Sequence, residues 1–260
     1  MAGPGLLAAL LEPAGLALAA TAICVQAALK RRFAKAGPFQ KDPGFAAQKL
    51  ICLPLMIPIV LVGCAGWAQR PRGLAPPDRL YGADWAGRLT GQLSIAVNLW
   101  DLPTYLVEPS LRTPVMLTHH SITLALQVFS VGTGLLQHYG TFFFGVTELS
   151  TLPLLFVDLV HPKHFPELGD RYPLANLACR GCFALSFLAV RVIYWPFVLA
   201  VLWGDLSWEL QAASGPAPAS LLRFIFAGSV FLTALQFYWG ALILRQIAGM
   251  LRPRPEASAE

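Results

Sequence analysis

The sequence predicts an all-α membrane protein, a polytopic bundle of about seven transmembrane helices. Hydrophobic residues make up 56% of the 260 residues and charged residues only 13%, whereas a soluble domain carries about 25% charged residues. Apolar runs of about 20 residues, the length that crosses a bilayer, recur along the whole chain. This pattern leaves no room for a separate soluble domain. The basic stripe with interleaved aromatics that would indicate nucleic-acid binding is not present either.

Each predicted span is an apolar run bounded by charged, proline-rich or glycine-rich stretches. Glu12 and Pro13 interrupt the first run, which also lacks the basic start and cleavage site of a signal peptide, so we expect it to be retained. Pro54 and Pro58 predict a kink in the second run. The last two runs are long enough to require tilting or a kink. The expected spans cover residues 6–29, 50–68, 89–107, 115–137, 141–160, 174–203 and 220–250.

Basic residues near the ends of the spans predict the orientation, because cytosolic loops are richer in Lys and Arg. Twelve of them lie on one side of the predicted membrane and five on the other. The N-terminus is therefore expected in the lumen and the C-terminus in the cytosol. Residues 108–114, and the histidine pair that follows them, then lie near the cytosolic face. The twelve are Lys30, Arg31, Arg32, Lys35, Lys41, Lys49, Arg112, Lys163, Arg171, Arg245, Arg252 and Arg254; the five are Arg70, Arg72, Arg79, Arg88 and Arg223.

Polar side chains inside the predicted spans form rows along helix faces, because residues three, four and seven positions apart align. Ionisable groups within a bilayer are costly, and their default interpretation is functional. We expect these rows to turn inward and line a cavity that binds a substrate. The alternative is hydrogen bonding between helices, worth about 1 kcal/mol for each contact. The residues concerned are Asn98, Asp101 and Tyr105; His120, Thr123 and Gln127; Glu148 and Thr151; Arg180 and Arg191; and Gln236.

His119 and His120, at the start of the fourth predicted span, are candidates for catalysis. A metal site is not expected, because adjacent helical residues diverge by about 100° and the i, i+4 histidine spacing of a zinc-binding helix is absent. An imidazole titrates near neutral pH, so it can take a proton from an amine or carry an acyl group. Asp101 or Glu148 would then orient the ring, as a carboxylate does in a catalytic triad. Recognition of a lipid headgroup without catalysis is the alternative.

A series of short motifs, in a fixed order among the apolar spans, carries a family resemblance. The motifs are Asp101, Thr118-His119-His120, Gly140, Glu148-Leu149-Ser150-Thr151, Arg191 and Gln236-Phe237-Tyr238-Trp239. Over residues 48–250 the chain resembles the TLC domain, named for TRAM, Lag1 and CLN8 proteins. The resemblance implies six helices that form a barrel around a central cavity open to lipid, in the endoplasmic reticulum.

The best-characterised enzymes of that family are ceramide synthases, which transfer an acyl chain from acyl-CoA to a sphingoid base and need a pair of histidines. The resemblance assigns this pair to His119 and His120. It assigns the acidic position before the pair to Asp101 and the first acidic position after it to Glu148. Thr151 stands where ceramide synthases have a second Asp. The chain is therefore more similar to the smaller TLC-domain proteins, several of which are linked to membrane lipid composition.

The apolar pattern and the resemblance together predict how the chain is divided and what it does. Residues 1–47 are expected to form a transmembrane helix and a basic loop, 48–250 the TLC domain, and 251–260 a disordered polar tail. The expected function is lipid homeostasis, with a lipid or acyl chain in the cavity and a sphingoid base N-acylated from acyl-CoA. The alternative is a non-enzymatic regulator of membrane lipid composition or a trafficking factor. Membrane lipids are the expected partners and acyl-CoA the candidate co-substrate. No cofactor, metal or nucleic acid is expected, and self-association as a homo-oligomer is left open.

Overall fold

The computed structural model describes residues 5–213 and 215–251, and every regular element within those ranges is helical. The all-α prediction is therefore confirmed for the described chain. Two stretches are wound differently from an α-helix: Thr141–Gly145 and Leu188–Tyr194 are π-helical, and Val146–Ser150 is a 3-10 helix. The α-helices are α1 (Leu6–Leu10), α2 (Pro13–Lys35), α3 (Pro43–Gln69), α4 (Pro76–Tyr81), α5 (Trp85–Val107), α6 (Pro114–Thr133), α7 (Gln137–Gly140), α8 (Thr151–Leu159), α9 (Pro166–Arg171), α10 (Pro173–Phe187), α11 (Trp195–Ala212) and α12 (Ala219–Leu251).

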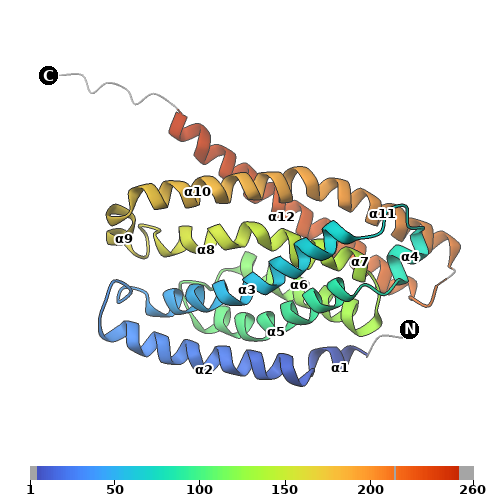
Figure 1. The fold of residues 1–260 in the computed structure, drawn as a ribbon, viewed down its shortest axis with the longest axis horizontal. Helices are drawn as coiled ribbons and strands as arrows, with labels where there is room; N and C mark the ends of the chain where they lie inside the picture. Colours follow the sequence, from blue (N-terminus) through green and yellow to red (C-terminus); the bar gives the residue numbers. More distant parts are fainter. Residues whose placement is uncertain (1–4, 214, 252–260) are drawn as a thin grey trace.

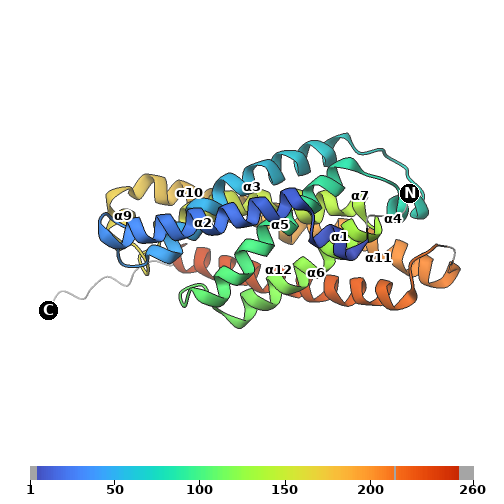
Figure 2. The ribbon, with the colours of Figure 1, turned by 90° about the horizontal axis from the view of Figure 1, so that it is seen from below.

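Long helices run roughly along one axis of the molecule, side by side (Figure 1). The start of α1 and the end of α12 lie at opposite ends of that axis, as an odd number of crossings requires (Figures 1 and 2). Six helical stretches among the described residues are long and apolar enough to cross a membrane, so the protein is a multi-pass integral membrane protein. They are Leu6–Lys35, Pro43–Gln69, Pro114–Thr133, Gln137–Leu159, Pro173–Ala212 and Ala219–Met250.

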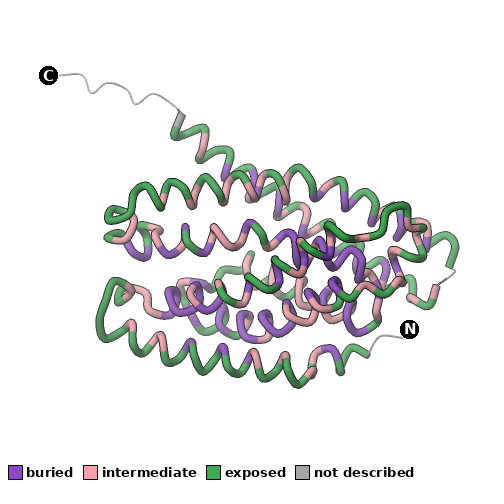
Figure 3. The backbone as a smooth tube through the Cα atoms, in the orientation of Figure 1, coloured by how far each residue is buried: buried purple, intermediate pink, exposed green. Residues whose placement is uncertain are grey.

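The seventh long helix, α5, has the length of a span but is more polar than the six. Its 23 residues reach about 35 Å, enough for a hydrocarbon core of about 30 Å. Thirteen of those residues are buried, because α2, α3 and α6 pack around the helix (Figure 3). A helix enclosed by protein does not need an apolar surface against lipid. This enclosure explains how α5 carries several polar side chains within the bundle.

Six helical units form a closed ring of contacts. Helix α3 packs on α5, α5 on α6, α6 on α12, α12 on α11, α10 on α8, and α8 on α3. Helix α2 lies outside the ring against α3 and α5, and α1 covers α6 (Figure 2). Where α3 meets the π-helical stretch after α7, Gly63 faces Gly145, and a Cβ atom at Gly63 would lie only 2.5 Å from the Cα atom of Gly145. The expected barrel-like arrangement of six helices is present, and α3 lies in close contact with the π-helical stretch at these two glycines.

Helix α3 begins earlier than expected, which changes the interpretation of Lys49. Asp42 caps the helix by accepting a hydrogen bond from the Phe45 amide at 3.2 Å, and Pro43 occupies the first helical position. Lys49 therefore lies inside a membrane-spanning helix, whereas the charge pattern predicted that it lies in the basic loop before that helix. Only 7% of its surface is exposed.

Residues 204–212 lie beyond the expected span of residues 174–203, but they continue α11 to Ala212. Asp205 in this stretch is buried and paired with Arg79 of α4 at 2.5 Å. Tyr139 of α7 also donates a hydrogen bond to Asp205. Hydrogen bonds with the Asp205 carboxylate, which outweigh the opposing effect of burial, raise the pKa of the Arg79 guanidinium further above its usual value. This pairing fastens α4 across one end of the bundle. The expected polar tail lies, from residue 252 on, outside the described residues.

A candidate site in the membrane: two joined cavities and a histidine pair

The ring of helices encloses two cavities that share one wall. The larger, about 490 Å³, reaches from residues 110–113, in the turn between α5 and α6, to the middle of the bundle. The smaller, about 70 Å³, continues towards the end of the bundle that α4 covers. His119, Thr123, Glu148 and Arg191 line both, so the polar centre of the bundle is the place where they meet.

His120 is oriented by Asn98 of the facing helix. The Asn98 amide nitrogen donates to the Ser94 carbonyl at 2.9 Å and to Gln127 Oε1 at 3.1 Å, so the amide oxygen must point the other way. That oxygen lies 3.1 Å from His120 Nδ1. The Nδ1 atom therefore carries the proton of the neutral ring, and Nε2 has a free lone pair. The two rows predicted on α5 and α6 do face each other at this contact.

Asp101 lies beside His120 without forming a hydrogen bond to it. One carboxylate oxygen accepts from Gln48 Nε2 at 2.8 Å, and the other is 3.8 Å from His120 Nδ1. The Tyr105 ring packs against the imidazole with ring centroids 4.6 Å apart. The negative charge of Asp101 therefore acts on His120 through space, while the hydrogen bond that fixes its tautomer comes from a neutral amide.

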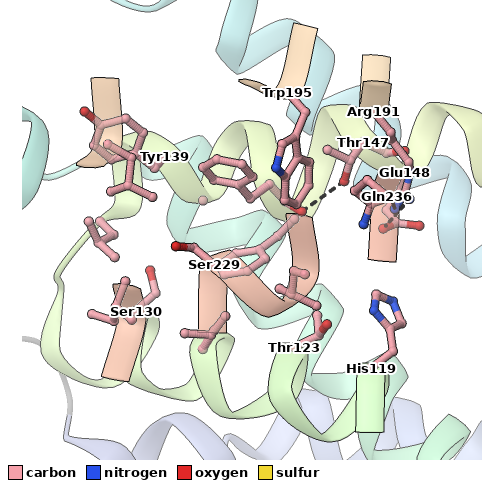
Figure 4. A pocket seen from close by; sticks show the side chains of 18 residues that line it. His119, Thr123, Ser130, Tyr139, Thr147, Glu148, Arg191, Trp195, Ser229 and Gln236 are labelled. Atoms are coloured by element: carbon pink, nitrogen blue, oxygen red, sulfur yellow. Dashed lines mark hydrogen bonds and ion pairs between the residues drawn. The ribbon is translucent and has the colours of Figure 1, made fainter. Parts of the chain in front are cut away.

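His119 and Thr123 present unused polar atoms to the shared wall. His119 Nδ1 and Thr123 Oγ1 are both buried and have no hydrogen-bond partner among the described residues. The His119 ring packs in edge-to-face geometry against the rings of His120 and Trp239, at 5.2 and 5.4 Å between centroids. Figure 4 shows His119 and Thr123 on α6, across the cavity from Arg191, Glu148 and Gln236. Buried polar atoms without partners are rare in folded proteins, so this wall has the character of a binding surface.

Glu148 is held by Arg191 and not by an imidazole. Its Oε1 atom lies 3.2 Å from the Arg191 guanidinium, and its Oε2 atom accepts from Thr151 at 2.6 Å. Arg191 also donates to the Thr147 carbonyl, to Ser150 Oγ and, at 3.4 Å, to Gln236 Oε1. Glu148 thus has a partner that the sequence pattern did not suggest, and the expectation that it orients a histidine is corrected.

Irregular helix geometry makes this pairing possible. Glu148 lies on the 3-10 stretch and Arg191 on the second π-helical stretch, and the two stretches are in contact. A π-helical turn holds more residues than an α-helical turn. The side chains after it therefore point in directions that differ from those of a regular α-helix. Such turns occur frequently at functional sites. Here they direct an arginine and a glutamate to the same point.

Lys49 and Gln48 also line the large cavity, and neither was predicted as a site residue from the sequence. Lys49 Nζ lies 3.0 Å from Asp158 Oδ2 and above the Phe45 ring. The signal that could have found them is Asp42-Pro43, an N-cap followed by the proline that begins many helices. That signal starts α3 six residues before Lys49 and turns Gln48, Lys49 and Cys52 towards one region of the helix surface.

Most of the predicted site residues meet in the two cavities. The large cavity is lined by Asn98, Asp101, Tyr105, His119, His120, Thr123, Gln127, Glu148, Thr151 and Arg191, and the small one also by Gln236. Arg180 is the exception, because it faces a groove on the outside of the bundle. No group of three or more His, Cys, Asp or Glu residues able to hold a metal ion exists in the described part of the chain.

The two cavities differ in chemistry. Charged lining residues are confined to the large cavity and the shared wall: Lys49, Asp101, Glu148, Asp158 and Arg191. Beyond that wall, the small cavity is bounded mainly by leucine, isoleucine and aromatic side chains. A molecule with a polar head and a single alkyl chain matches this arrangement.

Comparison with known proteins agrees with this geometry. Residues 46–245 match the family model of the TLC domain, TRAM_LAG1_CLN8, over more than half of the chain. No curated protein and no solved structure matches the chain.

Proposed function

Because this chain belongs to the TLC-domain family, we propose that it binds a lipid in the joined cavities and N-acylates a long-chain amine with acyl-CoA. The amine substrate on this proposal is a sphingoid base, and the membrane is that of the endoplasmic reticulum. The observation that carries the proposal is the orientation of His120, whose Nδ1 faces Asn98 and whose Nε2 is left as a base. A membrane helix would not need an imidazole oriented in this way for packing alone.

The shape of the cavities supports a lipid ligand. Along α6 the small cavity is lined from His119 to Ser130, 11 residues apart, a distance of about 17 Å for an α-helix. That length exceeds half of a hydrocarbon core of about 30 Å, so the end of a lipid chain can follow this wall. The small cavity is too narrow for a headgroup, which places the polar part of a ligand at His119 and in the large cavity.

Amide formation at this place follows ordinary acyl-transfer chemistry. The amine nitrogen attacks the thioester carbonyl, the C–S bond breaks, the amine loses a proton, and CoA leaves as a thiolate that is then protonated. A basic imidazole nitrogen accepts the amine proton, and such catalysis contributes about 10²–10⁴-fold to the rate. In a two-step variant, the imidazole first takes the acyl group from CoA and then yields it to the amine.

Each neighbour of His120 has a role in this scheme. Asn98 fixes the tautomer, and the Asp101 carboxylate, 3.8 Å from Nδ1, stabilises the positive ring that forms on proton transfer. His119 and Thr123 offer free polar atoms to the carbonyl or amine of the reacting lipid. Lys49, paired with Asp158 at 3.0 Å, adds a fixed charge pair to the large cavity, while the charged part of CoA stays on the aqueous side.

The test is product formation by the purified full-length protein, given acyl-CoA of several chain lengths and a sphingoid base. We expect an amide lipid by mass spectrometry and one free CoA thiol for each amide. His120→Ala and His119→Ala should abolish both signals. His138→Ala is the matched control, because His138 is a buried histidine of the same bundle that lines neither cavity. A stable wild-type protein that yields neither amide nor CoA would refute the acyltransferase proposal.

One observation favours a second candidate, a non-enzymatic regulator of membrane lipid composition or trafficking. The carboxylates near the histidines are occupied by Gln48 and Arg191, so no carboxylate–imidazole hydrogen bond exists at this site. A lipid-binding site needs no such bond. On this candidate, the His120→Ala protein would still copurify with a lipid and would restore membrane lipid composition in cells that lack the protein. Loss of that rescue together with loss of the amide would exclude it.

A further inference from the structure

A groove of about 440 Å³ lies on the outside of the bundle, where the loop after α8 and the short helix α9 meet the start of α10. It shares no lining residue with either internal cavity. The loop joins two membrane-spanning stretches, so the groove lies at the border between the bilayer and water. Its lining is Pro162, Pro166, Gly169, Asp170, Pro173, Asn176, Leu177 and Arg180.

Arg180 gives the groove an unpaired positive charge. It lies seven residues after the start of α10, about 10 Å along the helix and therefore within a span. Its Nε atom donates to Asn176 Oδ1 at 2.7 Å, which holds the guanidinium in place. The four N–H groups on its two terminal nitrogens have no partner, and no carboxylate lies within 4 Å, among the described residues.

The other arginine of the same span, Arg191, shows what a structural arginine looks like in this protein. It is buried and donates to five acceptors, including a carboxylate. Arg180 is only half-buried, and among the described residues only its Nε atom has a hydrogen-bond partner. An ionisable side chain within a span usually finds a polar partner, so the difference from Arg191 indicates that Arg180 has a partner outside the chain.

Asp170 adds an unpaired negative charge to the same groove. It forms no hydrogen bond and no ion pair within the described chain, and it is not within ion-pair distance of Arg180. Two opposite charges, held apart in one groove, are complementary to a molecule that carries both.

We propose that this groove binds one phospholipid through a zwitterionic headgroup that has a primary ammonium, as in phosphatidylethanolamine. The phosphodiester accepts hydrogen bonds from the terminal nitrogens of Arg180, a pairing for which the planar guanidinium is suited. The ammonium donates to the Asp170 carboxylate. Proteins recognise the quaternary ammonium of choline with aromatic faces, and none of the lining residues is aromatic. The lipid chains follow α10, where Leu174 and Leu177 are exposed.

The proposal is independent of the chemistry in the central cavity, and its test uses the full-length protein in detergent. Native mass spectrometry counts the lipids retained when phosphatidylethanolamine, phosphatidylcholine or phosphatidic acid is added. We expect the wild type to retain phosphatidylethanolamine with about tenfold higher affinity than phosphatidylcholine, a factor that corresponds to about 1.4 kcal/mol. Arg180→Gln should lower phosphatidylethanolamine binding by about the same factor. Asp170→Asn should remove the preference over phosphatidylcholine and leave phosphatidic acid unaffected.

Arg171→Gln is the matched control, because Arg171 is a cation of the same region that does not line the groove and instead lies over the Tyr172 ring. Thermal unfolding of all variants separates lost binding from lost folding. Glycerophosphoethanolamine, which has the headgroup without chains, tests the source of the ligand. Competition by this soluble molecule at equal concentration would overturn a lipid site in favour of a site for a soluble phosphodiester. Equal retention of the two zwitterionic lipids by the wild type, or equal losses in Arg180→Gln and Arg171→Gln, would overturn the proposal itself.

Discussion

The pairing of Arg191 with Glu148 can be tested by a double-mutant cycle. Arg191→Met removes the guanidinium from a side chain that is 9% exposed and leaves Glu148, 26% exposed, with only the Thr151 hydroxyl as a partner. Breaking a buried ion pair from one side costs about 3–5 kcal/mol. Because Glu148 lines the cavity and keeps some exposure, we expect a value near the lower end, about 3 kcal/mol.

The reverse change should cost less. Glu148→Gln keeps the side-chain volume, and Arg191 retains the Thr147 carbonyl, Ser150 Oγ and Gln236 Oε1 as acceptors. We expect a loss of about 1.5 kcal/mol, the scale of one hydrogen bond to a charged group. The double variant leaves no charge without a partner, so its loss should fall below the sum of the single losses by about 2 kcal/mol.

Thermal or denaturant unfolding in detergent, with a fixed lipid-to-detergent ratio, measures the four free energies. Ser186→Ala is a suitable control, since the Ser186 hydroxyl bonds only to its own helix backbone. Strict additivity of the two losses would show that the arginine and glutamate do not interact in the membrane protein. The interpretation that Arg191 and Glu148 form a preorganised charge pair in the shared wall would then be wrong.

Three further predictions concern the cavity and the orientation. Asn98→Leu leaves His120 Nδ1 without its acceptor and should lower amide formation about tenfold, the loss of about 1.4 kcal/mol, with unchanged expression. Thr123→Val should stabilise the delipidated protein by about 1 kcal/mol and weaken lipid retention, because it removes a buried hydroxyl that has no hydrogen-bond partner among the described residues; stabilisation with unchanged retention would contradict a ligand contact. A tag after Glu260 should be accessible to antibody when only the plasma membrane is permeabilised, and a glycosylation acceptor in residues 213–218 should be modified; glycosylation of the tag would reverse the predicted orientation.

The polar rows on α5 and α6 were predictable because both helices are regular there. A spacing of three, four or seven residues fixes the face of an α-helix, and polar rows in a bilayer have few places to turn except inward. Asn98 indeed touches both His120 and Gln127. The sequence alone therefore locates the centre of the large cavity.

The partner of Glu148 was not predictable in the same way. Glu148 and Arg191 are 43 residues apart, and each lies on a stretch that departs from 3.6 residues per turn. A helical projection with a constant angle per residue assigns the wrong face beyond such a stretch. The prediction that Arg180 lines the cavity was wrong for a similar reason. Arg180 lies on α10, before the π-helical stretch, and lines the outer groove, whereas Arg191 lies within that stretch and lines the cavities.

The arrangement of α2 and α5 explains how a bilayer tolerates such a polar centre. Helix α5 is the one long helix, within the described chain, that fails the apolarity expected of a span, and it carries Asn98 and Asp101 towards the cavity. Its opposite side is polar as well, and there Gln26 of α2 accepts hydrogen bonds from Trp100 and Thr104 at 2.6 and 3.0 Å. Thr104 can still donate to the Trp100 carbonyl of its own helix, but without α2 the Trp100 indole N–H would face hydrocarbon unsatisfied, which costs several kcal/mol. Helix α2 lies before the family match begins at residue 46, yet it is the element that allows the most polar helix of the domain to remain in the membrane.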